Sequence, residues 1–260
     1  MLDADFILLT LIGVGFAAGL IDAIAGGGGL LTIPALLLAG LPPVTALGTN
    51  KLQSMFGSGS ACLRYARAGQ LDWALWWPFA LLSGVGAAGG AALAGLLPPK
   101  VLSTLLPAFL VFIGVWFALR REPAEQDVER PRMGRATFGL TAVPSIGFYD
   151  GLFGPGTGSF FVLAFTTLRG QRLLRATAHT KLMNFASNIG GFIGFLALGA
   201  IDWRIGIAMG IAQFIGARIG AALAIRGGTR LIRPLLTFIC LATATRLLMD
   251  PAHPIHRLFG

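Results

Sequence analysis

The chain has 260 residues, of which 55% are hydrophobic and 12% charged, and its mean hydropathy is +0.76. Because roughly a quarter of the residues of a soluble domain are charged, this composition excludes a soluble globular protein and predicts a polytopic inner-membrane protein. The formal charge of +9 does not indicate a nucleic-acid surface, because the arginines are distributed over loops between apolar runs.

Apolar runs recur along the whole chain and differ in length. A helix needs about 20 apolar residues to cross a bilayer, and six runs are long enough: 44–63, 73–97, 101–119, 176–200, 205–225 and 231–249. The shorter runs form two pairs that each flank a glycine-rich break: 6–20 with 30–39, and 136–148 with 159–168. At about 1.5 Å per residue, such short runs end near the middle of a membrane, so each pair predicts a re-entrant hairpin.

Residues 1–40 are predicted to form the first hairpin. Its tip is a glycine tetrad: Gly26, Gly27, Gly28 and Gly29. Each glycine costs about 1 kcal/mol relative to alanine inside a helix, so the helix is expected to open there, just after Asp22. A cleaved signal peptide is the disfavoured alternative, because Asp3 and Asp5 stand where such a peptide needs positive charge.

The next segment, 44–66, is predicted to span the membrane, with an interruption of the helix at 48–50. Lys51 follows inside the apolar run, where a lysine costs roughly 2.5–3.5 kcal/mol on insertion scales. Asn50 and Ser54 share one helix face because they are four residues apart. Lys181, Asn184 and Asn188 form a second stripe of this kind. Such a stripe either lines a cavity or binds another helix.

Residues 120–135 interrupt the apolar pattern, because five arginines alternate there with four acidic residues and two prolines. The composition predicts a polar cytoplasmic linker, although a regulatory or lipid-binding segment is the alternative. The linker separates a first transmembrane repeat, 1–119, from a second, 136–250, which a short tail, 251–260, follows.

The second repeat reproduces the landmarks of the first at a nearly constant offset. Asp150 lies 128 residues after Asp22, and Lys181 lies 130 residues after Lys51. The glycine tetrad has its counterpart in a second hairpin tip, predicted at Gly151 to Gly158. The chain is therefore interpreted as one module used twice.

The loop arginines predict the relative orientation of the two repeats. If each repeat crosses the membrane an odd number of times, thirteen arginines face one side and four basic residues face the other. Four crossings per repeat would give ten against seven, and the positive-inside rule prefers the more asymmetric distribution. The prediction is an all-α polytopic protein with two inverted repeats, each a glycine-broken hairpin plus three spanning helices, and with both termini periplasmic.

The two breaks and the two buried lysines together predict a site for a small anion. Half-helices that begin at the breaks direct the positive ends of their dipoles, and free N–H groups, to the middle of the membrane. Transporters with broken helices hold their substrate at the interface of such repeats. The candidate substrate-binding residues are Gly26, Gly27, Gly28, Gly29, Asn50, Lys51, Ser54, Gly154, Gly156, Thr157, Gly158, Lys181 and Asn184.

Two alternatives stay open for the buried ionisable residues. Lys51 and Lys181 either supply charge to the site or cap carbonyl groups that the helix breaks release. Asp22 and Asp150 either couple transport to protons or accept hydrogen bonds from the amides of the breaks. His179 is a further candidate for a proton role, although Thr49 at the equivalent position does not support one.

The sequence lacks the residues that a metal site, a phosphate-binding loop or an enzyme active site would need. His253 and His256 have no further ligands nearby in sequence, so no metal site is expected, and Cys62 and Cys240 are expected to pack as small hydrophobes. The glycine-rich segments lack the lysine-serine or lysine-threonine ending of a phosphate-binding loop. An intramembrane enzyme would need a nucleophile beside a base or a metal cluster, which the sequence does not provide.

The stretches GFAAGLIDAIAGGGGLLTIPALLLAGLPPVTALGTNKLQSMFGSGSA, GFYDGLFGPGTGSFF and RATAHTKLMNFASNIG resemble the TauE/SafE sulfite exporter family, also called the 4-toluene sulfonate uptake permeases, and in particular its YfcA-like branch. The resemblance covers nearly the whole chain except the linker and the tail. It implies a bacterial inner-membrane transporter of sulfite, organosulfonates or related small anions, built from inverted repeats. Members differ in cargo and direction, so neither carries over to this chain, and export is the expected direction.

The resulting hypothesis is a secondary transporter that moves a small sulfur-containing anion by alternating access. Its expected partners are this anion and the lipid bilayer, without nucleic acid or cofactor, and a homo-oligomer is compatible with it. An anion channel shares all the polar features and is the first alternative. An intramembrane enzyme is the second.

Overall fold

The computed structural model describes residues 4–98, 100–106, 108–109, 112 and 130–227. All regular structure in these ranges is helical, which confirms the predicted all-α class. The helices are α1 (Ala4–Ala25), α2 (Gly29–Leu38), α3 (Pro43–Arg67), α4 (Trp73–Leu96), α6 (Arg135–Leu140), α7 (Ala142–Leu152), α8 (Thr157–Thr167), α9 (Leu173–Ala197) and α10 (Trp203–Gly227). Most of the predicted linker, the run 231–249, the tail with His253 and His256, and Cys240 lie outside the described residues.

Both glycine-rich segments interrupt a helix, as predicted. The first break separates α1 from α2, and the second separates α7 from α8. Gly26 and Gly154, which are 128 residues apart, have φ values of 81° and 89°, in the left-handed region that side chains other than glycine disfavour. The same backbone device therefore opens the chain at equivalent positions of both repeats.

The first hairpin differs from its prediction in the length of one limb. α1 has 22 residues, or about 33 Å, which is long enough to cross a bilayer. Together with α4 and α10, it is one of three described helices that are both long and apolar enough to span a membrane. The expectation of two short limbs is wrong for α1, because its helix continues through residues 21–25, beyond the apolar run 6–20.

The predicted interruption at 48–50 is also wrong, because α3 is continuous from Pro43 to Arg67. Gly48 has a different role there. A Cβ atom on Gly48 would lie 2.0 Å from the carbonyl oxygen of Ala200, so glycine at this position permits close packing instead of opening the helix. A single glycine in a 25-residue helix costs only about 1 kcal/mol, which packing easily offsets.

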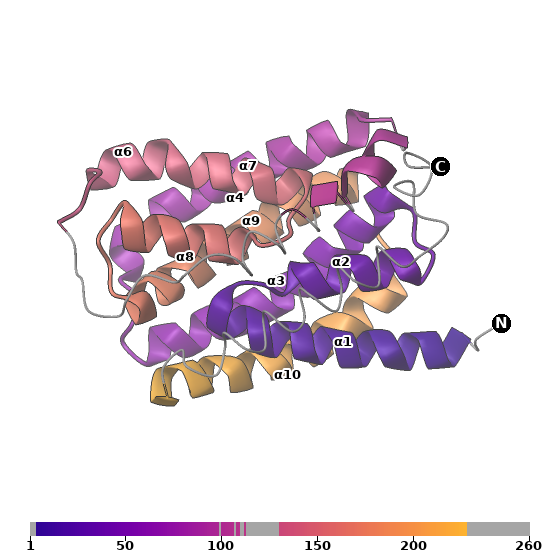
Figure 1. The fold of residues 1–260 in the computed structure, drawn as a ribbon, viewed down its shortest axis with the longest axis horizontal. Helices are drawn as coiled ribbons and strands as arrows, with labels where there is room; N and C mark the ends of the chain where they lie inside the picture. The colour runs from indigo at the N-terminus through magenta and orange to yellow at the C-terminus, as the bar shows by residue number, and fades with distance from the viewer. Residues whose placement is uncertain (1–3, 99, 107, 110–111, 113–129, 228–260) are drawn as a thin grey trace.

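Each hairpin packs against a long helix of the other repeat (Figure 1): α1 lies along α10, and α7 lies along α4. Glycines provide the close approach at equivalent places. A Cβ on Gly86 of α4 would lie 2.3 Å from the carbonyl oxygen of Pro144, and a Cβ on Gly216 of α10 would lie 2.1 Å from that of Phe16. In Figure 1, α1 runs away from the end at which the N-terminus lies, whereas α6 and α7 run toward that end.

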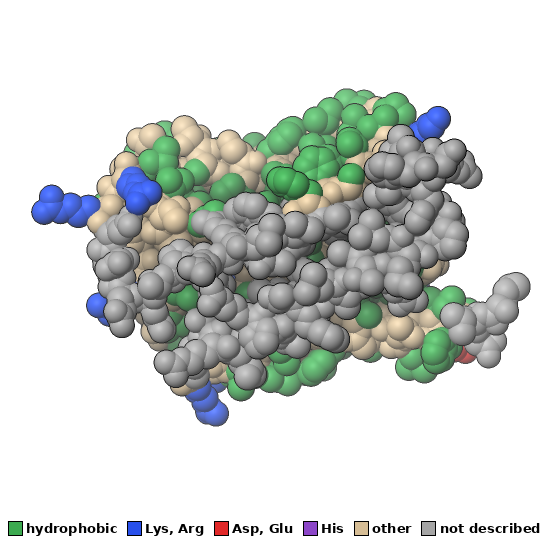
Figure 2. Space-filling model, viewed as in Figure 1, with side chains coloured by type: hydrophobic (Ala, Val, Ile, Leu, Met, Phe, Trp, Pro, Cys, Tyr) green, Lys and Arg blue, Asp and Glu red, His purple; other side chains and the backbone are tan. Residues whose placement is uncertain are grey.

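The surface shown in Figure 2 is apolar along its sides. Large hydrophobic side chains are exposed on the outer faces of the long helices, including Val85 of α4 and Ile211 of α10. The visible Lys and Arg side chains lie toward the ends of the long axis. This distribution suits a protein whose sides contact lipid and whose ends contact water.

Candidate functional site

Two buried ion pairs connect the repeats. The ammonium group of Lys51 on α3 lies 2.7 Å from Oδ1 of Asp150 on α7, and that of Lys181 on α9 lies 2.9 Å from Oδ2 of Asp22 on α1. The side chains of both lysines are at most 1% exposed. Each lysine thus pairs with the aspartate of the other repeat, directly beside a helix break.

The ion pairs also stabilise the ends of the broken helices. Lys181 Nζ donates to the backbone carbonyl oxygen of Asp22, close to the end of α1, and the same oxygen accepts from the backbone N–H of Gly26 at 2.9 Å. The backbone N–H of Gly28 donates to Asp22 Oδ1 at 3.3 Å. Asp22 thus accepts a hydrogen bond from an amide of its own break, whereas the carbonyl group that Lys181 contacts already has a backbone partner.

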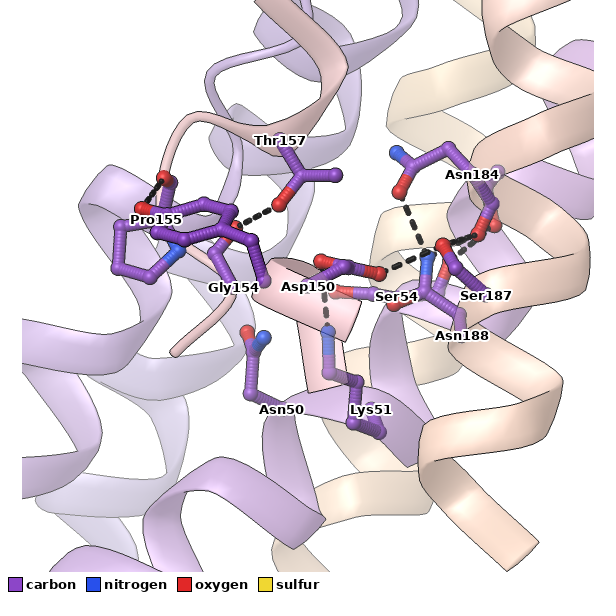
Figure 3. A network of polar contacts seen from close by, with 12 residues as sticks. Asn50, Lys51, Ser54, Asp150, Gly154, Pro155, Thr157, Asn184, Ser187 and Asn188 are labelled. Carbon is purple, nitrogen blue, oxygen red and sulfur yellow. Dashed lines mark hydrogen bonds and ion pairs between the residues drawn. The ribbon is translucent and has the colours of Figure 1, made fainter. Parts of the chain in front are cut away.

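Glycines leave room for the ion pair between Lys51 and Asp150. A Cβ on Gly154 would lie 3.2 Å from the Nζ atom of Lys51, and one on Gly191 of α9 would lie 3.0 Å from its Cδ atom. Figure 3 shows Lys51 reaching from α3 to Asp150, to which Ser187 of α9 also points. The Ser187 hydroxyl donates to Asp150 Oδ2 at 2.6 Å.

A polar cavity lies between the two breaks and encloses about 290 Å³ including its opening. Residues of both breaks and of the two helices α3 and α9 line it: Asp22, Gly26, Gly29, Asn50, Ser54, Asp150, Gly154, Gly156, Thr157, Gly158, Asn184 and Asn188.

Most of the predicted site residues therefore come together, but not all of them. Gly27, Gly28, Lys51, Lys181 and His179 do not line the cavity. The two lysines lie behind their aspartates, so the carboxylate groups and not the ammonium groups border the cavity.

Amide side chains provide neutral donors at the cavity. Oδ1 of Asn50 accepts hydrogen bonds from Thr32 Oγ1 at 2.5 Å and from Gln53 Nε2 at 3.0 Å. Because its oxygen is occupied, Asn50 has its NH₂ group to offer a ligand. Asn188 donates through Nδ2 to Asn184 Oδ1 at 3.4 Å, and both residues line the cavity.

The two breaks are hydrogen-bonded to each other. Ser159, at the start of α8, donates through its hydroxyl to the carbonyl oxygen of Ala25 at 2.7 Å and through its backbone N–H to that of Gly26 at 3.2 Å. The half-helices α2 and α8 begin at the cavity, so the positive ends of their dipoles point toward it.

His179 lies away from the cavity and makes structural contacts. Its Nδ1 atom lies 2.7 Å from Oε1 of Gln171, and its Nε2 atom accepts a hydrogen bond from the backbone N–H of Asp72 at 3.3 Å. In the other repeat, Oγ1 of Thr49 accepts from the backbone N–H of Asp202 at 2.9 Å. His179 and Thr49, which are equivalent in the two repeats, thus each accept a hydrogen bond from the backbone N–H of an equivalent aspartate.

Three residues of the site were absent from the predicted set: Thr32, Ser187 and Asn188. Asn188 lies four residues after Asn184, so the helical spacing already places it on the same face. Thr32 lies one turn into α2, and its contact with Asn50 depends on how α2 packs on α3, which no local pattern indicates. Among the described residues, no cluster of three or more His, Cys, Asp or Glu side chains could hold a metal ion.

Comparison with known proteins agrees with this architecture. The family model described as "Sulfite exporter TauE/SafE" matches residues 11–247. The "Probable membrane transporter protein ORF9" of Sinorhizobium sp is 51% identical over the whole length of both chains. The "Probable membrane transporter protein YfcA" of Escherichia coli K12 is 43% identical over 95% of this chain and 91% of its own length. A "Probable membrane transporter protein" of Haemophilus influenzae is 41% identical over 94% and 95%, respectively. No solved structure matches the chain.

Proposed function

Because the chain belongs to the TauE/SafE sulfite exporter family and is a membrane transporter of that type, we propose that it carries sulfite, an organosulfonate or a related small sulfur-containing anion through the cavity between its two helix breaks. Family membership and its YfcA-like relatives confirm the expectation of a transporter instead of an enzyme. Export is the proposed direction, in accordance with the family description.

The observation that carries the proposal is that both breaks line one small polar cavity. Two helix N-termini, at Gly29 and Thr157, border it and favour negative charge. The NH₂ group of Asn50 adds a neutral donor, and a hydrogen bond to a charged ligand contributes about 1.5–3 kcal/mol. These groups suit a compact oxyanion, whose oxygens accept several hydrogen bonds at once.

Alternating access is proposed to follow from an inverted relation of the two repeats. The opposite directions of α1 and α7 support it, as do the glycine contacts that recur 130 residues apart at Gly86 and Gly216. An exchange of the packing of the two hairpins would then expose the cavity to the other side.

The proposed orientation places the linker 120–135 in the cytoplasm and both termini in the periplasm of the bacterial inner membrane. Figure 1 supports it, because the ends of α3 and α10 and the beginnings of α6 and α9 lie at one end of the molecule. These are the elements beside the described loop arginines: Arg64, Arg67, Arg130, Arg132, Arg135, Arg169, Arg172, Arg175 and Arg226. The positive-inside rule assigns that end to the cytoplasm.

The test is the flux of radiolabelled sulfite and of 4-toluenesulfonate into proteoliposomes that contain the full chain. A carrier gives saturable flux that unlabelled substrate on the opposite side accelerates. Ohmic single-channel current would favour the anion channel, and no flux of either anion would contradict the proposed cargo.

The site itself is tested with Asn50→Leu, which removes the NH₂ donor. We expect the dissociation constant for the transported anion to rise by about ten- to a hundredfold, which corresponds to the loss of one hydrogen bond to a charged ligand. Gln70→Leu, in the loop between α3 and α4, is the matched control and should leave the dissociation constant unchanged. Equal affinities of the two variants would place the anion elsewhere.

A further inference from the structure

The charges buried in the described part of the chain balance one another. The ionisable residues among its buried polar side chains are Asp22, Lys51, Asp150, His179 and Lys181. Lys51 and Lys181 each pair with an aspartate, and both ring nitrogens of His179 are engaged outside the cavity. The site is therefore electrically neutral before an anion binds.

The two kinds of charge are not equally close to the cavity. Asp22 and Asp150 line it, whereas Lys51 and Lys181 do not. An anion in the cavity would meet two carboxylate groups before any ammonium group, and it would leave a net negative charge in a region of low dielectric constant. Both effects oppose the binding of an anion alone.

The two aspartates differ in their exposure. Asp150 forms an ion pair with Lys51 at 2.7 Å and accepts from the Ser187 hydroxyl at 2.6 Å, and its side chain is 3% exposed. Asp22 accepts from Lys181 at 2.9 Å and from the Gly28 amide at 3.3 Å, and its side chain is 10% exposed. Asp22 is thus the more accessible of the two carboxylates, and its cation has a second partner, the backbone carbonyl oxygen of Asp22.

On the basis of the proposed function, we propose that Asp22 takes up a proton when the anion binds, so that the anion and the proton are transported together. The proton comes from the aqueous phase and binds to the carboxylate of Asp22. Lys181 loses its ion pair but keeps its hydrogen bond to the backbone carbonyl oxygen of Asp22. The site then carries one positive charge, which the anion neutralises.

The other groups around Asp22 do not provide this charge. α3 contributes the neutral side chains of Tyr65, whose hydroxyl donates to the carbonyl oxygen of Ala23, and of Cys62. Asp150 of α7 is held by its own lysine. The sequences of α2 and α8 contain no ionisable residue. The charged side chains of α10 are all exposed: Arg204, Arg218 and Arg226. Lys181 of α9 is the partner whose charge a proton on Asp22 releases.

The test is calorimetric binding of methanesulfonate, which stays ionised near neutral pH, to the purified full chain in two buffers of different ionisation enthalpy. We expect the uptake of about one proton per anion bound, and an apparent affinity that falls as the pH rises, by up to about tenfold per pH unit. Asp22→Asn should bind methanesulfonate with an affinity independent of pH and without proton uptake. Asp5→Asn, at an exposed aspartate far from the cavity, is the matched control and should behave like the unaltered protein.

The outcomes separate this inference from the proposed function. Binding of methanesulfonate without proton uptake by the unaltered protein would overturn the inference alone, as would unchanged proton uptake by Asp22→Asn. Absence of binding of both methanesulfonate and sulfite would overturn the proposed function and the inference with it. If Asp22→Asn does not fold, the double variant Asp22→Asn/Lys181→Met leaves no buried charge unpaired. It lacks the ammonium group that the anion neutralises, so it should lose methanesulfonate binding, and retained binding with proton uptake would overturn the inference.

Discussion

The two halves of the molecule share their helix breaks and ion pairs but differ in the groups that bind the two aspartates beside the cavity. In the second half, the Ser187 hydroxyl holds Asp150, whereas Gly57 stands at the equivalent position of the first half. There, Asp22 receives a backbone amide from its own break instead. The shared features, which are the breaks, the ion pairs and the glycine contacts, form the scaffold. The different partners of Asp22 and Asp150 indicate that the two halves contribute differently to anion binding and to proton coupling.

The largest effect is expected when one charge is removed from the ion pair whose carboxylate is more deeply buried. Lys51→Met leaves Asp150 buried without its cation, which should lower the free energy of unfolding by about 3–5 kcal/mol. Lys181→Met should cost less, because the side chain of Asp22 is more exposed and can be hydrated from the cavity.

The measurement is equilibrium unfolding of the purified protein in mixed micelles. Arg204→Met is the matched control, because it breaks an ion pair with Asp5 whose two side chains are both well exposed, and such pairs contribute about 0–1 kcal/mol. Equal stability of Lys51→Met and Arg204→Met would show that the buried pair does not hold the halves together.

The glycine contacts should respond equally in the two halves. Gly86→Ala and Gly216→Ala each place a Cβ atom within 2.3 Å of a backbone carbonyl oxygen, so the packed helices must move apart. We expect each change to lower the unfolding free energy by about 1–3 kcal/mol. Gly13→Ala in α1 meets no atom within 4 Å and is the control, which should be neutral or stabilising by up to about 1 kcal/mol. Unequal losses in thermal unfolding would show that the equivalence of the two hairpins is incomplete.

A smaller effect is expected at the contact between the two breaks, which the second half alone provides through a side chain. Ser159→Ala removes the hydroxyl that donates to Ala25, and Leu31 at the equivalent position of the first half has no hydroxyl. The expected loss is about 0.5–1.5 kcal/mol in unfolding free energy. Thr10→Ala is the control, because that hydroxyl bonds only within its own exposed helical turn. A loss no larger than that of Thr10→Ala would mean that the contact between the breaks is not a source of stability.

The comparison of the halves also shows which features of the fold and the site can be predicted from the sequence alone. The two breaks and the equivalence of Lys51 with Lys181 follow from glycine content and from the constant offset. The pairing of Lys51 with Asp150 does not follow, because an offset says which residues are equivalent and not which ones meet. Gly48 was misinterpreted for a related reason, since a glycine that opens a helix and one that admits a neighbouring backbone look alike in sequence.

The smallest effect is expected at His179. This residue is titratable, whereas Thr49, its equivalent in the other half, stays neutral near physiological pH. Thr49 accepts the backbone N–H of Asp202 just as His179 accepts that of Asp72, so neither contact requires a proton to be exchanged. His179→Gln keeps a neutral acceptor of similar reach, and we expect a change in transport rate of less than about twofold and the same pH dependence. Methanesulfonate flux into proteoliposomes between pH 5 and 8, the range in which an unperturbed histidine titrates, provides the measurement. Asp22→Asn serves as the comparison, because its pH dependence should be lost. The opposite result is a flux that loses its pH dependence in His179→Gln and keeps it in Asp22→Asn. It would show that the coupled proton binds at His179 and not in the cavity, and the two halves would then differ at Thr49 and His179.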